Sequence, residues 1–433
     1  MADTSYVRTE MLPEQAPPPS TIGLIGWFRQ NLFNGWANSI LTLLALYFIY
    51  VVLKAIVPWI FVPSWSGNDV HECRALVAAA WGEGHHGACW GVIRERWVQL
   101  LFGFYPKELY WRPILAFILL FVALAPILFA SVPRKLLIFS AIFPFLMVWL
   151  LWGGTLWLPI SVILGFVIGW VLFKATLEHA GALIANLLLI LAPIIWWLTA
   201  CGGFANLMHG IIPIGIEPVE SAKFGGFMLS ITIGLVGIAL SLPLGILLAL
   251  GRQSDLIILK AVCVGFIEFI RGVPLITLLF VASTLLNIFM PPGTNFDIIL
   301  RVIIMVTLFA SAYMAEVIRG GLAALPKGQY EAADSLGLDY AQATRLIIMP
   351  QALKISIPGI VGTFIGLFKD TVLVSIIGLL DPVGLKQTIN GDVAWTGLNW
   401  EIYGFICLIF FIFCFGMSRY SMYLERKLAT GHH

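Results

Sequence analysis

The sequence predicts an all-α polytopic membrane protein with about ten transmembrane helices. Hydrophobic residues make up 60% of the 433-residue chain and charged residues only 11%, and the mean hydropathy is +0.95. A chain of this composition has too few polar residues to cover the surface of a soluble protein, so it is expected to lie in a lipid bilayer. Its 16 Trp residues suit the membrane interfaces, and its 41 Gly and 23 Pro residues suit spans that pack closely and kink.

Apolar windows long enough to cross the hydrocarbon core follow one another along the chain. In the first half, the candidate spans are residues 37–61, 113–130, 136–152, 156–173 and 182–199. In the second half, they are residues 227–250, 256–270 (continuing with breaks to 289), 296–317, 355–379 and 400–420.

Residues 1–36 are expected to form a tail and an interfacial helix before the first span. Residues 1–20 are rich in charge and proline, and they lack the short basic start and apolar run of a cleaved signal peptide, which indicates a disordered tail. In residues 22–36, Ile25, Phe28 and Leu32 recur at helical spacing opposite Arg29. This pattern is typical of a helix lying in the membrane interface.

Basic residues near the span ends all fall on one side of the membrane when ten spans are counted. The positive-inside rule makes that side the cytoplasm, so both termini are expected there. The same count places residues 326–350 in the cytoplasm and the loop 64–112 outside. The basic residues used are Arg29, Arg134, Lys135, Lys174, Arg252, Arg319, Lys327, Arg345, Lys354, Arg419, Arg426 and Lys427.

The longest polar stretch of the second half, residues 326–350, predicts two short helices. The first is expected over residues 327–336, because it follows Pro326 and Gly337 can take the left-handed conformation that ends a helix. Asp339 with Gln342 predicts a capping box at the start of the second, and Pro350 is expected to end it. The stretch is either a docking site for another protein or an amphipathic loop that only joins two spans.

Within this stretch, Glu331-Ala332-Ala333 is followed after three residues by Gly337 and later by Ile347 and Pro350. The pattern resembles the EAA loop of bacterial ABC importer permeases, with Met349 where the family usually has a Leu of similar volume. Residues 267–274, 312–321 and 367–371 are similar to the polar amino acid branch, the histidine and glutamine type. With its long N-terminal extension, the chain most resembles the M-type permease of the general L-amino-acid importers.

The resemblance implies a type I ABC importer permease core over residues 225–425, formed by the last five spans. A five-span extension over residues 37–200, with an extracytoplasmic loop at 64–112, would precede it in a bacterial inner membrane. The implied partners are a second related permease, two copies of an ABC ATPase that use ATP and Mg²⁺, and a periplasmic binding protein that delivers an L-amino acid. The implied ATPase-coupling residues are Glu331, Ala332, Ala333, Asp334, Ser335, Leu336, Gly337 and Pro350.

The chain itself shows no sign of an enzyme. It contains no GxxxxGK[ST] loop that would bind ATP phosphates, so no cofactor is expected on it. Its net charge of +2 is too small to predict binding to nucleic acid. His179 and His209 are isolated, which argues against an intramembrane enzyme. The main rival function is an ATP-independent secondary amino acid transporter, which would need buried acids in both halves of the chain.

Three acids lie within the predicted spans, where a charge is costly unless it is paired or functional. Glu268 and Glu316 each precede an arginine by three residues, so the sequence predicts pairing with Arg271 and Arg319 as one interpretation. Asp370 cannot pair with its neighbour Lys369, because adjacent helical residues point about 100° apart. The resemblance places the Lys-Asp-Thr span on the translocation path, which makes Asp370 and Thr371, then Glu316 and Glu268, the candidates for that path.

Cys73 and Cys89 both lie in the predicted extracytoplasmic loop, an oxidising setting, and a disulfide between them is expected. Two free thiols are the alternative. A zinc site with His71, His85 and His86 is a further alternative, although their spacing matches no tight ligand pattern, and no metal is expected. The other cysteines, Cys201, Cys263, Cys407 and Cys414, are expected to pack in or near spans.

Overall fold

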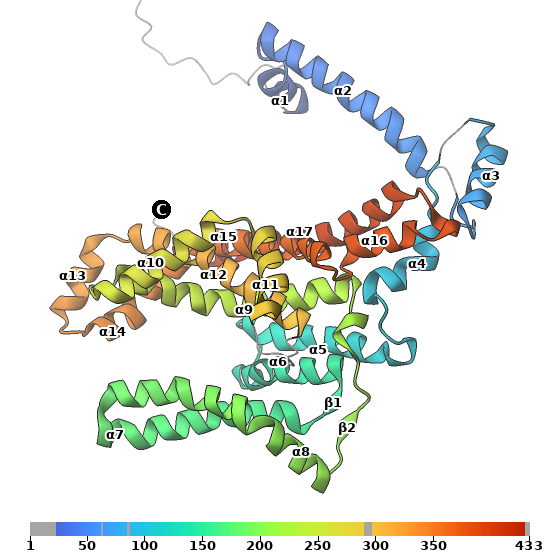
Figure 1. The fold of residues 1–433 in the computed structure, drawn as a ribbon. Helices are drawn as coiled ribbons and strands as arrows, with labels where there is room; N and C mark the ends of the chain where they lie inside the picture. Colours follow the sequence, from blue (N-terminus) through green and yellow to red (C-terminus); the bar gives the residue numbers. More distant parts are fainter. Residues whose placement is uncertain (1–22, 62–63, 85–86, 290–296, 429–433) are drawn as a thin grey trace, which may run out of the picture. The chain divides into compact units, whose positions relative to one another are not determined.

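The computed structural model describes residues 23–61, 64–84, 87–289 and 297–428 (Figure 1). Within these ranges, eight helices are long and apolar enough to cross a membrane, or up to ten if each of two bent pairs counts as one span. The predicted all-α polytopic fold class is confirmed. The tail predicted for residues 1–20 and the start of the span predicted from Phe296 lie outside the described residues.

The chain divides into two compact units, residues 1–91 and 92–433. The first holds α1 (Gly23–Asn31), α2 (Trp36–Phe61) and α3 (Val70–Trp81). Helix α2 has no buried residue and is apolar on every face, as expected for a helix surrounded by lipid.

In the first unit, a disulfide joins Cys73 of α3 to Cys89, with 5.7 Å between the Cα atoms. Both cysteines are buried, and the segment around Cys89 is fixed by a hydrogen bond from Ala88 N–H to the Trp59 carbonyl (2.9 Å). His71 is exposed, while His85 and His86 lie outside the described residues. Among the described residues, no group of three potential ligands could hold a metal ion.

The second unit begins with helices that belong to the N-terminal half of the chain. Much of the predicted loop 64–112 is helical. In order, the elements are α4 (Gly91–Phe102), η1 (Lys107–Leu109), α5 (Trp111–Leu128), η2 (Arg134–Leu136), α6 (Leu137–Trp152), β1 (Gly154–Thr155), α7 (Trp157–Thr199), α8 (Cys201–Ile211) and β2 (Gly215–Ile216). The two short strands pair antiparallel, with Gly154 opposite Ile216.

Helix α7 contains both the fourth and the fifth predicted spans. The chain reverses at Gly181, whose φ of 81° suits glycine, and the indole N–H groups of Trp196 and Trp197 donate to carbonyls of Ser161 (2.9 Å) and Val162 (3.1 Å). The fourth span runs on to Ala182 and not only to residue 173. Lys174 does not interrupt it, because its ammonium lies 4.3 Å from the centre of the Trp170 ring.

The second half of the chain supplies the remaining helices of this unit. They are η3 (Ser221–Lys223), α9 (Gly226–Gln253), α10 (Ile257–Gly272), α11 (Leu275–Phe289), α12 (Ile298–Ala323), α13 (Lys327–Ser335), α14 (Tyr340–Ala343), the π-helical turn η4 (Thr344–Ile348), α15 (Met349–Asp370), η5 (Thr371–Ile377), α16 (Pro382–Asn390), η6 (Val393–Trp395) and α17 (Asn399–Leu428). Helices α10 and α11 meet at an angle of 101°, next to Pro274, which cannot donate a backbone hydrogen bond.

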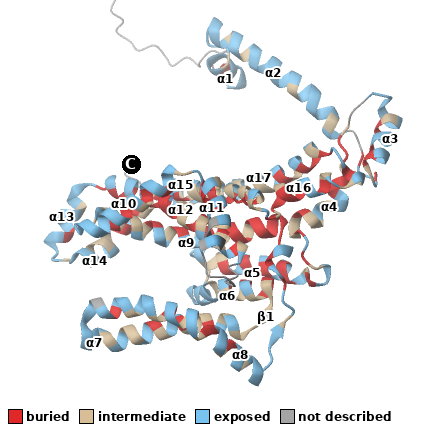
Figure 2. Cartoon of the chain, in the orientation of Figure 1, coloured by how far each residue is buried: buried red, intermediate tan, exposed pale blue. Residues whose placement is uncertain are grey.

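Buried residues gather along α9 and α12 and where α5 and α6 meet them (Figure 2). A single hydrophobic cluster joins Leu120 and Leu151 of these N-terminal helices to Ile233 of α9 and Val306 of α12. Tyr105 belongs to the same cluster, and its buried hydroxyl donates to the Leu151 carbonyl of α6 (2.8 Å). Two of the extra spans therefore pack directly on the C-terminal helices.

Candidate functional site

The first half of the polar segment (residues 326–350) ends as its sequence predicts. Helix α13 stops at Ser335, and Gly337 takes a φ of +69°. The N–H of Leu338 donates to the Ala333 carbonyl (3.3 Å) and that of Gly337 to the Asp334 carbonyl (2.9 Å). This pair of hydrogen bonds is the Schellman motif, so the prediction that Gly337 ends the helix is confirmed.

The second half begins as predicted but does not end as predicted. Asp339 accepts from the Gln342 N–H (2.7 Å), and the Gln342 side chain accepts from the Asp339 N–H (3.3 Å), which confirms the capping box. The expected stop at Pro350 is wrong, because helical structure continues from Tyr340 to Ile377. Pro350 lies in the first turn of α15, after the π-helical turn η4, where a missing N–H costs little.

The polar segment is held firmly to the helices behind it. Ile348 and Met349 are buried in one cluster with Ile318 of α12, and the Gln351 side chain donates to the Gln329 side chain of α13 (2.9 Å). At Gly321, α12 approaches α15 so closely that a Cβ atom would collide with the backbone of Ala352. The polar segment is therefore packed against both α12 and α15.

The outer surface of the segment carries three large apolar side chains, of which only Leu336 is among the predicted coupling residues. Leu336, Tyr340 and Leu346 are 72%, 70% and 64% exposed. Of the predicted coupling residues, Ala333 is fully buried, whereas Glu331 and Ala332 are exposed. An exposed apolar surface on a polar segment is typical of a protein-binding site.

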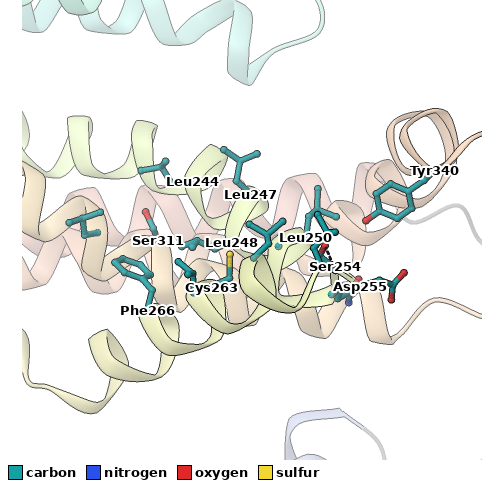
Figure 3. A pocket seen from close by; sticks show the side chains of 16 residues that line it. Leu244, Leu247, Leu248, Leu250, Ser254, Asp255, Cys263, Phe266, Ser311 and Tyr340 are labelled. Atoms are coloured by element: carbon teal, nitrogen blue, oxygen red, sulfur yellow. Dashed lines mark hydrogen bonds between the residues drawn. The ribbon is translucent and has the colours of Figure 1, made fainter. Parts of the chain in front are cut away.

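A pocket of about 820 Å³ lies between α9 and α10 and reaches the polar segment (Figure 3). Its walls are mainly apolar side chains, among them Leu244 and Leu247 of α9. Figure 3 shows Tyr340 at one end, near Ser254 and Asp255.

Two of the three acids predicted for the translocation path, Glu268 and Glu316, belong to an ion-pair cluster (Arg252, Glu268, Arg271, Glu316 and Arg319) at the ends of α9, α10 and α12. Oε1 of Glu316 lies 2.5 Å from Nη1 of Arg252 and 3.6 Å from Nη1 of Arg271, and Oε2 lies 3.0 Å from Arg319. The predicted Glu316–Arg319 pair is confirmed. The predicted Glu268–Arg271 pair is wrong. Glu268 instead forms an ion pair with Arg252 in the last turn of α9 (3.0 Å), and Arg271 forms one with Glu316.

A separate cavity of about 280 Å³ lies between α12 and α15. Asp370 lines it together with Tyr313 and Thr363, and in the described part of the chain no hydrogen bond or ion pair reaches the Asp370 carboxylate. Thr371 does not line the cavity. Its side chain is fully buried, and its hydroxyl donates to the Phe368 carbonyl (2.7 Å). The remaining lining residues are Phe309, Ala310, Gly366 and Leu367.

Tyr313 connects this cavity to the ion-pair cluster. Its ring lines the cavity, and the Arg271 guanidinium carbon lies 5.6 Å from the ring centre, within the range of a cation–π contact. Sequence reasoning missed Tyr313 and the role of Arg252, because their contacts join positions far apart in the chain. The cavity thus has a carboxylate in its wall, and the Arg271 guanidinium contacts the ring of one of its lining residues.

Comparisons with known proteins agree on one group. Residues 241–429 match the family "Binding-protein-dependent transport system inner membrane component". The chain is 56% identical over 433 residues, all of both chains, to the glutamate/glutamine/aspartate/asparagine transport system permease protein BztC of Rhodobacter capsulatus. It is 40% identical to the inner membrane amino-acid ABC transporter permease protein YhdY of Escherichia coli, over 98% of this chain and 99% of that one.

Among solved structures, one described as an amino acid ABC transporter with histidines is similar to part of the chain. The two are 31% identical, with a TM-score of 0.42, over 46% of this chain and 91% of that chain.

Proposed function

Because the chain belongs to the family of binding-protein-dependent transport system inner membrane components, we propose that it is the permease subunit of an ATP-driven importer for L-amino acids. The observation that carries this proposal is the 56% identity, over the full length of both chains, to a permease named for four amino acids. The polar segment, with its capped helices and exposed apolar side chains, supports it independently.

In this proposal the chain is one part of a larger assembly in a bacterial inner membrane. A periplasmic binding protein delivers the amino acid, and a second related permease completes the path. Two copies of a separate ATPase bind ATP and Mg²⁺ and contact residues 331–337 from the cytoplasm, where both termini of this chain also lie. This chain itself performs no covalent chemistry.

The structure suggests how ATP binding acts on the path. Helical structure continues from Tyr340 to Ile377, so the second half of the polar segment and Asp370 belong to one run of helix. When the ATPase moves α13 and α14, α15 moves with them, because Ile348 and Gln351 fix these helices together. A displacement at the cytoplasmic side therefore changes the cavity that Asp370 lines.

Asp370 is the best candidate for receiving the ammonium group of the substrate. Its carboxylate lines a cavity, and burial of a charge without a partner is costly in a membrane. Glu316 is less suited, because three guanidinium groups already surround it. Glu268 is engaged by Arg252.

The test is reconstitution of the purified assembly into vesicles. We expect an ATPase and a second permease to copurify with this chain in mild detergent, and uptake of L-amino acids to require both ATP and the binding protein. The rival secondary transporter predicts that the chain alone accumulates amino acids on an H⁺ or Na⁺ gradient without ATP. Uptake by the chain alone would overturn the proposal.

A further inference from the structure

A hollow of about 820 Å³ lies on the N-terminal half of the chain and shares no lining residue with the two cavities described above. Residues of one stretch, 95–110, line it, and this stretch comprises the second half of α4, the turn after it and η1. We call this surface the outer hollow. Phe104 lines it and is 48% exposed. Two acidic and two basic residues line it as well (Glu95, Arg96, Lys107 and Glu108).

The outer hollow is fixed to the core helices. Gly103 lies so close to Gly225, the residue before α9, that a Cβ atom on either glycine would collide with the backbone of the other. Arg96 forms an ion pair with Asp392, two residues after α16 ends. The outer hollow therefore lies at the start of α9 and beside the end of α16, and Figure 1 shows α4 next to α16.

These contacts place the outer hollow on the side of the membrane opposite the polar segment. Helix α15 begins at Met349, within the polar segment, and runs for 22 residues to Asp370. This length corresponds to about 33 Å along the helix axis, which is enough to cross the hydrocarbon core. Both η5 and α16 follow at its far end. In the proposed orientation, with the polar segment in the cytoplasm, the outer hollow faces the periplasm.

The composition of the outer hollow suits a protein partner. Its two positive and two negative side chains give no net charge, so it has no electrostatic preference for anionic lipid or another polyanion. An exposed aromatic side chain in a hollow that also carries charged residues is typical of a protein–protein interface, in which the aromatic residue supplies binding energy and the charges orient the partner. A surface that is already fixed also loses little conformational freedom on binding.

We propose that the outer hollow is a docking surface for the periplasmic amino-acid-binding protein. Phe104 is its main apolar contact, and Lys107 and Glu108 pair with charges of the partner. The family is described as binding-protein-dependent, so such a protein has to reach the outer face of the assembly. Because the hollow is fixed to α9 and α16, a bound protein acts on the core through the N-terminal extension. This inference rests on the proposed function.

The test measures ATP hydrolysis by the purified permease and ATPase assembly in vesicles. The binding protein that supports wild-type uptake is added at increasing concentration, saturated with its amino acid. We expect Phe104→Ala to raise the concentration for half-maximal stimulation by about tenfold. Glu108→Lys should raise it by about threefold, less at high salt, because Glu108 acts through a charge at the rim. Basal ATPase activity without the binding protein should match the wild type in both variants, since both side chains are exposed.

Two controls separate docking from a general effect on the assembly. Glu178→Lys is matched to Glu108→Lys, because Glu178 is also an exposed acid but belongs to α7, and its stimulation curve should equal that of the wild type. A photoreactive phenylalanine analogue at position 104 should cross-link to the binding protein. The same analogue at position 178 should not.

An unchanged half-maximal concentration in Phe104→Ala would overturn the inference. A cross-link from position 104 to the second permease or to lipid, and not to the binding protein, would also overturn it. In either case, ATP-driven uptake by the wild type leaves the proposed function standing. If wild-type uptake needs no binding protein, the proposed function fails and the inference fails with it.

Discussion

Arg252 donates a hydrogen bond to Glu316 over 2.5 Å and so joins the last turn of α9 to α12, 64 positions further along the chain. The Glu316 side chain is only 17% exposed, and Arg271 and Arg319 approach the same carboxylate. Partly buried charges of one sign are unfavourable without their partner. Glu316 therefore keeps three arginines of three helices together.

We predict that Glu316→Gln destabilises the protein by about 2 kcal/mol, because it leaves the guanidinium groups of Arg252, Arg271 and Arg319 without their main anionic partner. The measurement is the thermal unfolding midpoint in detergent, which should fall by several degrees. Glu178→Gln is the control, because Glu178 is exposed. Equal midpoints for Glu316→Gln and the wild type would show that the cluster adds no stability.

The cluster also shows which contacts a sequence can predict. Glu316 and Arg319 are three residues apart on one helix, so their pairing follows from helical spacing. The caps at Gly337 and Asp339 are equally local, and both predictions are confirmed. Pairing between Arg252 and Glu268 depends on how α9 packs on α10 and has no signature in the spacing of residues.

Pro350 failed as a predicted stop for a different reason. A proline ends a helix where a backbone N–H donor is required at its position, and the π-helical turn before α15 places Pro350 in a first turn, where none is required.

The cavity at Asp370 was only partly predictable. A carboxylate in an apolar run points to function, but Tyr313 and Thr363 join it only through the packing of α12 on α15.

Gly337 tests the coupling role of the polar segment. Gly337→Val forces a β-branched side chain into a φ of +69°, which should unwind the end of α13 and displace the exposed Leu336. We predict that ATP hydrolysis continues while uptake falls at least severalfold. Glu331→Lys, which reverses a charge on the exposed face of α13, should uncouple the two activities in the same way.

Gly328→Ala is the matched control for Gly337→Val. Gly328 lies in α13, the helix that ends just before Gly337, has no left-handed φ, and a Cβ atom there meets nothing within 4 Å. ATPase activity and uptake are measured on the same vesicles. Normal coupling in both Gly337→Val and Glu331→Lys would count against docking of an ATPase on this segment.

Asp370→Asn tests the translocation path. The substitution keeps the size of the side chain and removes the charge that attracts an ammonium group, so uptake should fall by about tenfold or more. Assembly and basal ATPase activity should remain, since Asp370 makes no hydrogen bond or ion pair in the described part of the chain. Wild-type uptake by this variant would remove Asp370 from the path.

Asp381 predicts a pH dependence of stability. Its carboxylate caps α16 by accepting from the N–H groups of Gly384 (2.9 Å) and Val383 (3.1 Å), and burial raises its pKa to about 6. The folded state then binds a proton more tightly than the unfolded state, so this group's contribution is most favourable at low pH and is lost as pH rises from about 4 to 6. The loss is at most about 3 kcal/mol.

Asp381→Asn keeps a capping oxygen but does not titrate. The measurement is the thermal unfolding midpoint of the wild type minus that of Asp381→Asn. This difference should decrease between pH 4 and pH 6, because the contributions of all other carboxylates are the same in both proteins and cancel. A difference that stays constant over this range would contradict a raised pKa at Asp381.

The disulfide between Cys73 and Cys89 is predicted to stabilise the segment of the first unit that contains it. It closes a loop with a sequence separation of 16, for which the chain-entropy model gives about 3 kcal/mol. Cys73→Ala should make residues 64–90 more sensitive to limited proteolysis while the second unit stays resistant.

Reduced and non-reduced peptides that contain both cysteines should also differ in mass and mobility. Alkylation of both thiols in unreduced protein would show that no bond forms, and an unchanged cleavage rate in Cys73→Ala would show that the bond does not stabilise the segment.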